Sequence, residues 1–172
     1  NTEDAKYASI FDGSGLPDIL NKRFFPIDLI LDANYSPVIK QAISDFCEFR
    51  GDIFSALDVG FKAGYTDTVA FRDPSGVGMS SWKTSIFAHD FIVADTYNGD
   101  DMPVTTTYFL AKKIPLVDNA KGIQYPFVGP IDGTVTGFKS INFIPNEDQK
   151  EVLYKKQINY IEKDPRRTNF GS

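Results

Sequence analysis

The sequence predicts an α/β fold, in which a mixed sheet is flanked by helices. Two observations predict it. Short apolar runs that are typical of strands alternate along the chain with segments whose apolar residues recur every three or four positions, as in helices. A strand–helix–strand crossover near residues 27–59 also implies parallel pairing. At 172 residues the chain can bury a sizeable core, so we expect one domain over residues 1–172.

The crossover begins with a predicted strand at Ile27–Leu31, an apolar run that Pro26 and Asp32 bound. Ser36 stands where a helix N-cap belongs, and Pro37 occupies the first helical position. The spacing then predicts a helix over Pro37–Phe49. One face of this helix is apolar and carries Ile39, Ala42, Ile43, Phe46 and Cys47.

The tripeptide Arg50-Gly51-Asp52 is a ligand for cell-adhesion receptors in other settings. Here it lies between this helix and a second predicted strand, Ile53–Val59. Gly51 falls just past the helix end, where a residue that can adopt positive φ is favoured. We therefore interpret the tripeptide as a structural corner, with Arg50 and Asp52 flanking Gly51 in solvent, because short motifs match often by chance.

The remaining elements are predicted from turn formers and periodicity. We expect an irregular first segment with one or two helical turns, a long loop near residues 60–83, and one strand over residues 84–97. In that strand Phe87, His89, Phe91 and Val93 would share a face. A helix within residues 104–119 should stop at Pro115, and residues 122–140 should form a loop with short extended pieces.

Towards the end of the chain the sequence predicts a strand at residues 141–145, then a helix, then a further strand at residues 158–164. Asn146 and Gln149 have the spacing of a capping box at the start of that helix, Glu147–Lys156. The chain starts without Met, and we expect it to be part of a longer polypeptide.

Charge and composition exclude several classes of protein. The net charge of −5 and the pI near 4.8 argue against a nucleic-acid partner, since binding to phosphates needs clustered Lys and Arg. No apolar run is long enough for a membrane span, so we expect no membrane contact. The single Cys47 cannot form an internal disulfide and, lying on the apolar helix face, is expected to be a buried thiol.

Two groups of residues are candidates for chemistry. Asp32, Asn34 and Ser36 resemble the Asp-x-Ser-x-Ser metal site of von Willebrand A-type domains, yet they also serve as a turn and an N-cap without a metal. His89 could act as a base or ligand, but it is the only histidine, and a strand histidine with local hydrogen bonds explains it more simply.

Motifs for nucleotide binding, for a nucleophilic serine and for zinc binding are absent from the sequence. We therefore predict no catalytic, cofactor-binding or metal-binding residues, no cofactor, and no enzymatic activity.

Three stretches resemble the subunits of contractile bacteriophage tail sheaths. They are AISDFCEFRGDIFSALDV (residues 42–59), SIFAHDFIVADTYNGDDMPVTTTYFLAKKIPLVDNAKGIQYPFVG (residues 85–129) and EVLYKKQINYIEKDP (residues 151–165). The second carries the family's Asp118, Gly122 and Pro126 passage, and the third its Ile158, Asn159 and Ile161 ending. Their order over more than a hundred residues strengthens the resemblance.

The resemblance implies a structural subunit that stacks as a homo-oligomer in rings around a tail tube and drives genome ejection by rigid-body movement. Its implied partners are the tail tube protein, the baseplate and the tail terminator. The implied location is the virion tail, assembled in the host bacterial cytoplasm. Two alternatives stay open from the residues themselves: a metal-dependent adhesion module using Asp32, Asn34 and Ser36, and a small α/β enzyme using His89.

Overall fold

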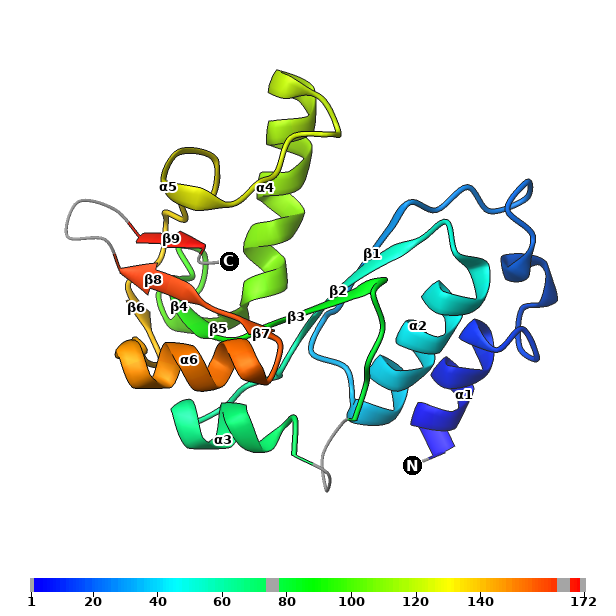
Figure 1. Cartoon of the computed structure of the whole chain (residues 1–172), viewed down its shortest axis with the longest axis horizontal. Helices are drawn as coiled ribbons and strands as arrows, with labels where there is room; N and C mark the ends of the chain where they lie inside the picture. Colours follow the sequence, from blue (N-terminus) through cyan, green and yellow to red (C-terminus); the bar gives the residue numbers. More distant parts are fainter. Residues whose placement is uncertain (1, 74–77, 164–167, 171–172) are drawn as a thin grey trace.

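A computed structural model describes residues 2–73, 78–163 and 168–170 (Figure 1). Its centre is a four-stranded parallel sheet with the strand order β1-β2-β3-β7. The strands are β1 (Leu29–Leu31), β2 (Phe54–Asp58), β3 (Thr84–Phe87) and β7 (Ile158–Asn159). The predicted α/β fold is confirmed, as is the parallel pairing of the first two strands.

Two smaller antiparallel sheets accompany the parallel one. The first has the order β5-β4-β6 and consists of β4 (Asp90–Ala94), β5 (Asp101–Thr105) and β6 (Ser140–Ile141). The second pairs β8 (Ile161–Lys163) with β9 (Thr168–Phe170). The fold thus contains both parallel and antiparallel strands, as expected, but in separate sheets, with the parallel sheet in the middle.

Helices cover both faces of the parallel sheet, because successive residues of a strand point to opposite faces. Leu57 packs with buried residues of α2 (Pro37–Arg50), whereas its neighbour Ala56 packs with buried residues of α4 (Thr106–Lys121). Figure 1 shows α2 and α1 (Thr2–Phe11) on one side of the sheet and α4 on the other. The result is a three-layer arrangement.

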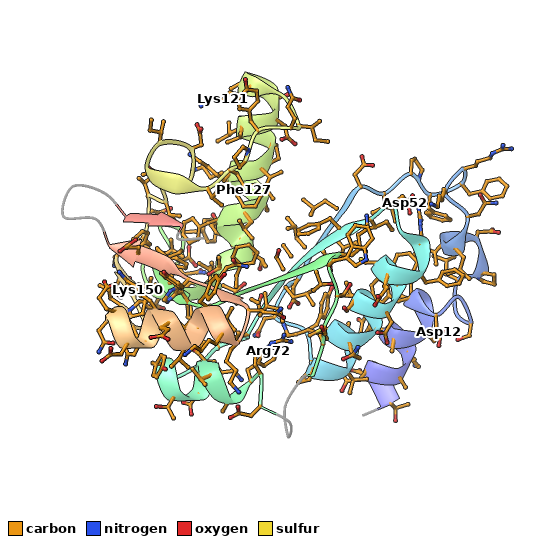
Figure 2. The ribbon with its side chains drawn as sticks, in the orientation of Figure 1. Asp12, Asp52, Arg72, Lys121, Phe127 and Lys150 are labelled. Carbon is orange, nitrogen blue, oxygen red and sulfur yellow. The ribbon has the colours of Figure 1, made fainter. Side chains whose placement is uncertain are left out.

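Two further helices, α3 (Tyr65–Ala70) and α6 (Glu147–Lys155), lie side by side below β7 (Figure 1). Leu153 of α6 belongs to the same buried cluster as the α2 residues. Arg72, labelled in Figure 2, connects this region by donating hydrogen bonds to the carbonyls of Met79 and Lys156. The segment after α3 is thereby tied to the turn that follows α6.

Local signals predicted the first crossover and the last helix well. Helix α2 begins at Pro37 and ends one residue later than expected, and Gly51 follows it with a φ of 71°. Asn146 and Gln149 form both hydrogen bonds of the capping box before α6.

Cys47 is fully buried, as expected from its place on the apolar face of α2, and burial raises the pKa of its thiol.

The strand predicted over residues 84–97 is wrong, because the chain turns a corner within it. Strand β3 ends at Phe87 in the parallel sheet, and β4 begins at Asp90 in the antiparallel sheet. His89 occupies the corner with a φ of 82°. All four residues from Phe87 to Asp90 are buried, so the apolar pattern continues through the corner and conceals it.

The strand predicted over residues 158–164 is likewise two strands, β7 and β8, in different sheets, and Asp164 lies outside the described residues. The strand expected at residues 141–145 is reduced to β6, and the loop expected at residues 122–140 holds the single turn α5 (Gly129–Asp132).

Three expectations about helices were also wrong. The first segment contains α1 and the 3-10 turn Pro17–Leu20, more helix than expected, and the loop near 60–83 contains α3, with residues 74–77 outside the described part. Pro115 does not stop α4, which continues to Lys121. Pro115 and Ala111 are both exposed, so the carbonyl that loses its helical partner lies on the side where water can replace it.

None of the helices in the described residues combines the length and the apolarity that crossing a membrane requires.

Candidate functional site

A cluster of buried charges lies at the carboxyl ends of β1 and β2, where ligands usually bind in α/β folds. Asp32 follows β1, Asp58 ends β2, and Lys40 reaches them from the first turns of α2. The Lys40 Nζ atom lies 3.0 Å from Asp58 Oδ1 and also contacts Asp32 Oδ2. Each of the three residues is at most 4% exposed. We call them the Asp–Lys–Asp cluster.

The carboxylate oxygens of the cluster all have partners. Asp32 accepts hydrogen bonds from the backbone N–H groups of Tyr35 (3.0 Å) and Asp58 (3.2 Å). Asp58 accepts from the Gly60 N–H at 2.8 Å and from the Thr107 hydroxyl of α4 at 3.1 Å. Burial and the neighbouring Asp58 raise the pKa of Asp32, while Lys40 opposes this shift. The cluster is therefore a closed internal network that joins the three layers.

The candidate metal residues lie around this cluster. The Asp32 carboxylate faces the Lys40 ammonium, a cation that it shares with Asp58. The Asn34 side chain lies close to Gly60, and the Ser36 hydroxyl is buried without a hydrogen-bond partner among the described residues. Among the described residues, no group of three or more His, Cys, Asp and Glu side chains is placed to hold a metal ion.

Sequence reasoning missed Lys40, Asp58 and Thr107. A signal existed for the first two. Asp32 and Asp58 each come directly after an apolar run, and the carboxyl ends of neighbouring parallel strands meet at one edge of a sheet. Lys40 also interrupts the apolar face of α2, where a charged residue needs a buried partner. Nothing local indicates Thr107, which approaches from a distant part of the chain.

His89 is 1% exposed at the corner between β3 and β4, and its ring centroid lies 4.5 Å from that of Phe143. Neither ring nitrogen forms a hydrogen bond in the described part of the chain, so the expected local hydrogen bonds are wrong. Burial lowers the pKa of His89 to about 4, although the Asn142 side chain acts in the opposite direction. The imidazole is therefore neutral near pH 7 and closed off from solvent.

Asp90, the next residue, is a second buried titratable group outside the Asp–Lys–Asp cluster. Its Oδ2 atom accepts a hydrogen bond from the Lys62 N–H at 2.6 Å, while Oδ1 is buried and has no hydrogen-bond partner in the part of the chain that the structure describes. Burial raises the pKa of Asp90 to about 6, and the nearby Asp58 acts in the same direction. Within the described residues, neither His89 nor Asp90 lines the hollow beside β3 or the groove between α1 and α2.

The Arg-Gly-Asp corner is held by Arg50. The sequence predicted this side chain in solvent, and that was wrong, because Arg50 is buried. Its guanidinium donates to the carbonyls of Ile19 (2.8 Å) and Phe25 (3.0 Å) and to both carboxylate oxygens of Asp52 (3.1 and 2.8 Å). Figure 2 shows Asp52 beside the end of α2. A receptor could not reach Arg50 without breaking these contacts, which confirms the structural role of the corner.

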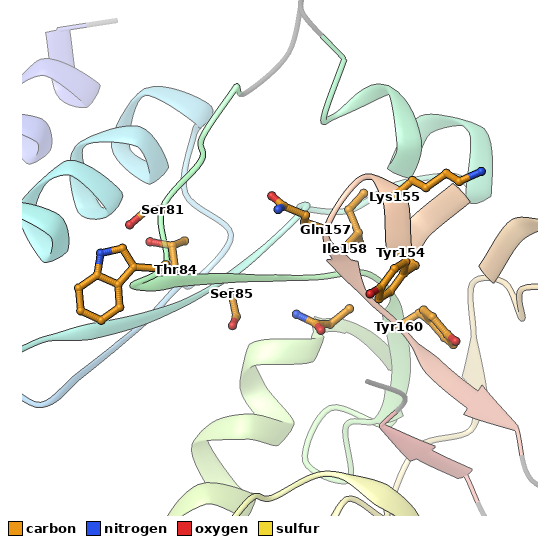
Figure 3. A pocket seen from close by; sticks show the side chains of 10 residues that line it. Ser81, Thr84, Ser85, Tyr154, Lys155, Gln157, Ile158 and Tyr160 are labelled. Carbon is orange, nitrogen blue, oxygen red and sulfur yellow. The ribbon is translucent and has the colours of Figure 1, made fainter. Parts of the chain in front are cut away.

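The part of β3 that β7 leaves unpaired carries a surface hollow of about 540 Å³ (Figure 3). Strand β7 pairs only with Ile86 and Phe87 of β3, and in the described residues no strand covers Thr84 and Ser85 on that side. The hollow lies beside these two residues and is further lined by Trp82, Tyr154 and Tyr160. Trp82 and Tyr154 are 78% and 76% exposed.

No protein-family model matches the chain, and no curated protein matches it. Among solved structures, the chain is similar to the helical sheath of the anti-feeding prophage in its contracted state, with 16% identity and a TM-score of 0.61 over 90% of this chain. It is also similar to a chain of the baseplate of the same assembly, with 15% identity and a TM-score of 0.62 over 96% of this chain. These matches confirm, at the level of the fold, the resemblance to contractile sheath subunits. The chain spans 40% and 41% of the lengths of those two chains.

Proposed function

We propose that the chain is the structural subunit, or part of the subunit, of a contractile sheath. The observation that carries this proposal is the fold match over 90% of the chain to a helical sheath. The closed Asp–Lys–Asp cluster supports it, because the edge of the sheet where α/β enzymes bind ligands is filled here by an internal ion network.

The finer proposal is that copies of the subunit stack in rings around a tail tube and move as rigid bodies when the sheath contracts, driving genome ejection from a phage tail. Its partners are then other copies, the tube protein, the baseplate and the tail terminator. This chain spans about two fifths of the length of the matched chains, which supports the proposal that it belongs to a longer subunit whose other parts supply further contacts.

Strand addition at the free edge of β3 is the contact that we expect to link neighbours. An extended arm that pairs with β3 at Thr84 would gain backbone hydrogen bonds there, with the Thr84 N–H exchanging its 3.4 Å contact with the Ser81 carbonyl for one with the arm. The adjacent hollow of about 540 Å³ would receive its side chains beside Tyr154 and Tyr160. We expect such an arm to come from a part of the longer subunit outside these 172 residues.

The two alternative functions have less support. A metal-dependent adhesion module would need Asp32 to exchange its buried Lys40 partner for a cation. An enzyme using His89 would need that side chain to be accessible, and it is 1% exposed against Phe143.

Electron microscopy of the longer protein tests the proposal, with the 172-residue chain as the matched control. We expect the longer protein to polymerise into helical tubes and the chain alone to elute as a monomer, as measured by light scattering after size exclusion. A longer protein that remains monomeric, or a chain that forms a stable dimer at micromolar concentration, would count against the sheath function.

A further inference from the structure

An apolar groove runs between α1 and α2, on the face of the molecule away from α4. It has a volume of about 450 Å³, and its lining includes Phe11, Val38, Ala42 and Phe46. Phe49 forms one wall and is 75% exposed, and Val38 is 57% exposed. Exposed aromatic and aliphatic side chains gathered around a hollow are typical of protein-binding surfaces.

The charged residues that line this groove are both acidic. Asp12 follows α1 and Asp45 lies on α2, and both are exposed. The Asp45 carboxylate receives one hydrogen bond from the Gln41 amide, at 2.8 Å, and Asp12 accepts one from the Ser14 N–H. The groove therefore suits an apolar segment that carries positive charge.

The outer face of α4 has these properties. Tyr108, Lys112, Pro115, Leu116 and Asn119 are exposed and recur at three- and four-residue steps, so they form one stripe along the helix. Tyr108 and Leu116 are 55% and 57% exposed. We call these five exposed residues the α4 stripe. Lys112 is the charged residue among them, and the half-buried Lys113 and Asp118 lie along the two margins of the stripe.

We propose that the α4 stripe of one copy of the chain docks in the α1–α2 groove of another copy. The inference rests on the proposed sheath function and specifies one of its contacts. Within one chain the two surfaces cannot meet, because the parallel sheet separates them. Asp12 lines the groove, and Figure 2 shows it on the opposite side of the molecule from Lys121, which lies at the far end of α4.

The partner is a second copy because the chain itself carries both complementary surfaces: an apolar groove lined by Asp12 and Asp45, and an apolar stripe that carries Lys112. The contact joins two different surfaces, so each copy keeps one free groove and one free stripe. In the chain alone this contact is too weak to survive size exclusion. In the longer subunit, which adds further contacts, such heterologous contacts continue from copy to copy and generate an open helical polymer unless the copies close into a ring. In this arrangement Leu116 enters the groove near Phe49, and Lys112 approaches Asp45.

Cysteine cross-linking tests this contact. Phe49→Cys and Leu116→Cys variants are mixed, one of them isotope-labelled, and oxidised, and the disulfide-linked pairs are identified by mass spectrometry. We expect mixed pairs between residues 49 and 116 in several-fold excess over pairs of identical variants. The unsubstituted chain is the blank, since its Cys47 is buried.

Phe24→Cys and Tyr97→Cys form the matched control pair, because both residues are exposed and lie outside the two surfaces. Equal yields from the two pairs would overturn the proposal. Charge reversal adds a second readout: Asp45→Lys or Lys112→Asp alone should reduce the 49–116 yield several-fold, and the two together should restore it. A 49–116 cross-link yield that stays the same in both charge-reversal variants would also contradict the inferred geometry.

The same cysteines in the longer protein separate this inference from the proposed function. Tubes without a 49–116 cross-link would overturn the contact and leave the sheath function intact. A 49–116 cross-link in a protein that forms no tubes would support the contact and count against the sheath.

Discussion

At the residue scale, the cluster at the sheet edge depends on Lys40. Its ammonium is the cation that faces the buried carboxylates of Asp32 and Asp58. Breaking a buried ion pair on one side is costly, because the remaining charge stays buried without compensation. The stability of the central layer is therefore sensitive to this single side chain.

Replacing Lys40 by Met should lower the free energy of unfolding by about 3–5 kcal/mol, the range for removing one partner of a buried ion pair. Urea denaturation measures the loss. Lys6→Met, at an exposed position of α1, is the control and should change stability by no more than about 0.5 kcal/mol. Similar values for the two variants would show that the cluster contributes little.

Asp90 should make stability depend on pH. Its pKa is about 6 in the folded chain and 3.8 without the fold, so the folded state holds a proton between these values. The stabilisation is complete below about pH 4 and is lost as the pH rises through 6. Asn at this position imitates the protonated form at every pH.

The free energy of unfolding of Asp90→Asn, relative to the native chain, should therefore increase by about 2–3 kcal/mol between about pH 4 and pH 8. Urea denaturation of both proteins across this range provides the measurement. His89, whose pKa is lowered, contributes with the opposite sign, but it is present in both proteins and cancels in the difference. A difference that stays constant with pH would show that Asp90 is ionised throughout.

Gly51 and Gly64 allow a test of backbone strain in isolation. A Cβ atom added at either position would meet no atom within 4 Å. Gly51 has a φ of 71°, whereas Gly64 is extended with a φ of 177°. Gly51→Ala should thus cost about 1 kcal/mol or more, and Gly64→Ala should cost less. Thermal unfolding compares them, and equal costs would contradict the assigned backbone conformation.

At the scale of elements, the two helices predicted to have side-chain N-caps differ in the structure. Asn146 accepts a hydrogen bond from the Gln149 N–H at 2.9 Å and stabilises the start of α6. Ser36 precedes α2 at the expected position, but its hydroxyl forms no capping hydrogen bond and is buried without a partner in residues 2–73, 78–163 and 168–170. A cap position read from sequence does not establish that the cap forms.

Asn146→Ala should therefore destabilise the chain by about 1 kcal/mol, the usual loss for an N-cap. Ser36→Ala should leave stability unchanged or raise it slightly, because it removes a buried hydroxyl that has no hydrogen bond. Chemical denaturation of the two variants under identical conditions decides the matter. Equal losses would mean that Ser36 caps α2 in solution.

The elements that the sequence predicted well are those with local chemical signals. Pro37, Gly51 and the Asn146 box each fix a helix end through contacts a few residues away. The corner at His89 could not be predicted, because burial continues through it and the change of sheet is decided by distant strands. The Asp–Lys–Asp cluster was predictable only in part. The sequence shows an aspartate at the end of each strand, but only the parallel register of β1 and β2 brings the two aspartates together.

At the scale of the whole molecule, two hydrophobic clusters lie on the two faces of the parallel sheet, one on the side of α2 and the other on the side of α4. Leu57 and Ile86 face the α2 side, while Ala56 and Phe87, their neighbours along β2 and β3, face the α4 side. Thr107 also joins α4 to Asp58 across the sheet edge. Because each central strand contributes to both clusters, neither cluster can be lost while the other stays intact.

We therefore expect the chain to unfold in one cooperative transition. Ile43 and Ile161 are matched probes, since both are at most 1% exposed and they lie in different clusters. Ile43→Val and Ile161→Val should each lower the free energy of unfolding by about 0.5–1.5 kcal/mol. Each should shift the whole transition, with the far-UV signal of the helices and the near-UV signal of the aromatic residues moving together. If either variant separated the two signals, the clusters would be independent folding units, and the sheet would not couple the α1–α2 layer to α4. Such coupling is what the proposed rigid-body movement of a sheath subunit requires, because force applied at one face must reach the other without local unfolding.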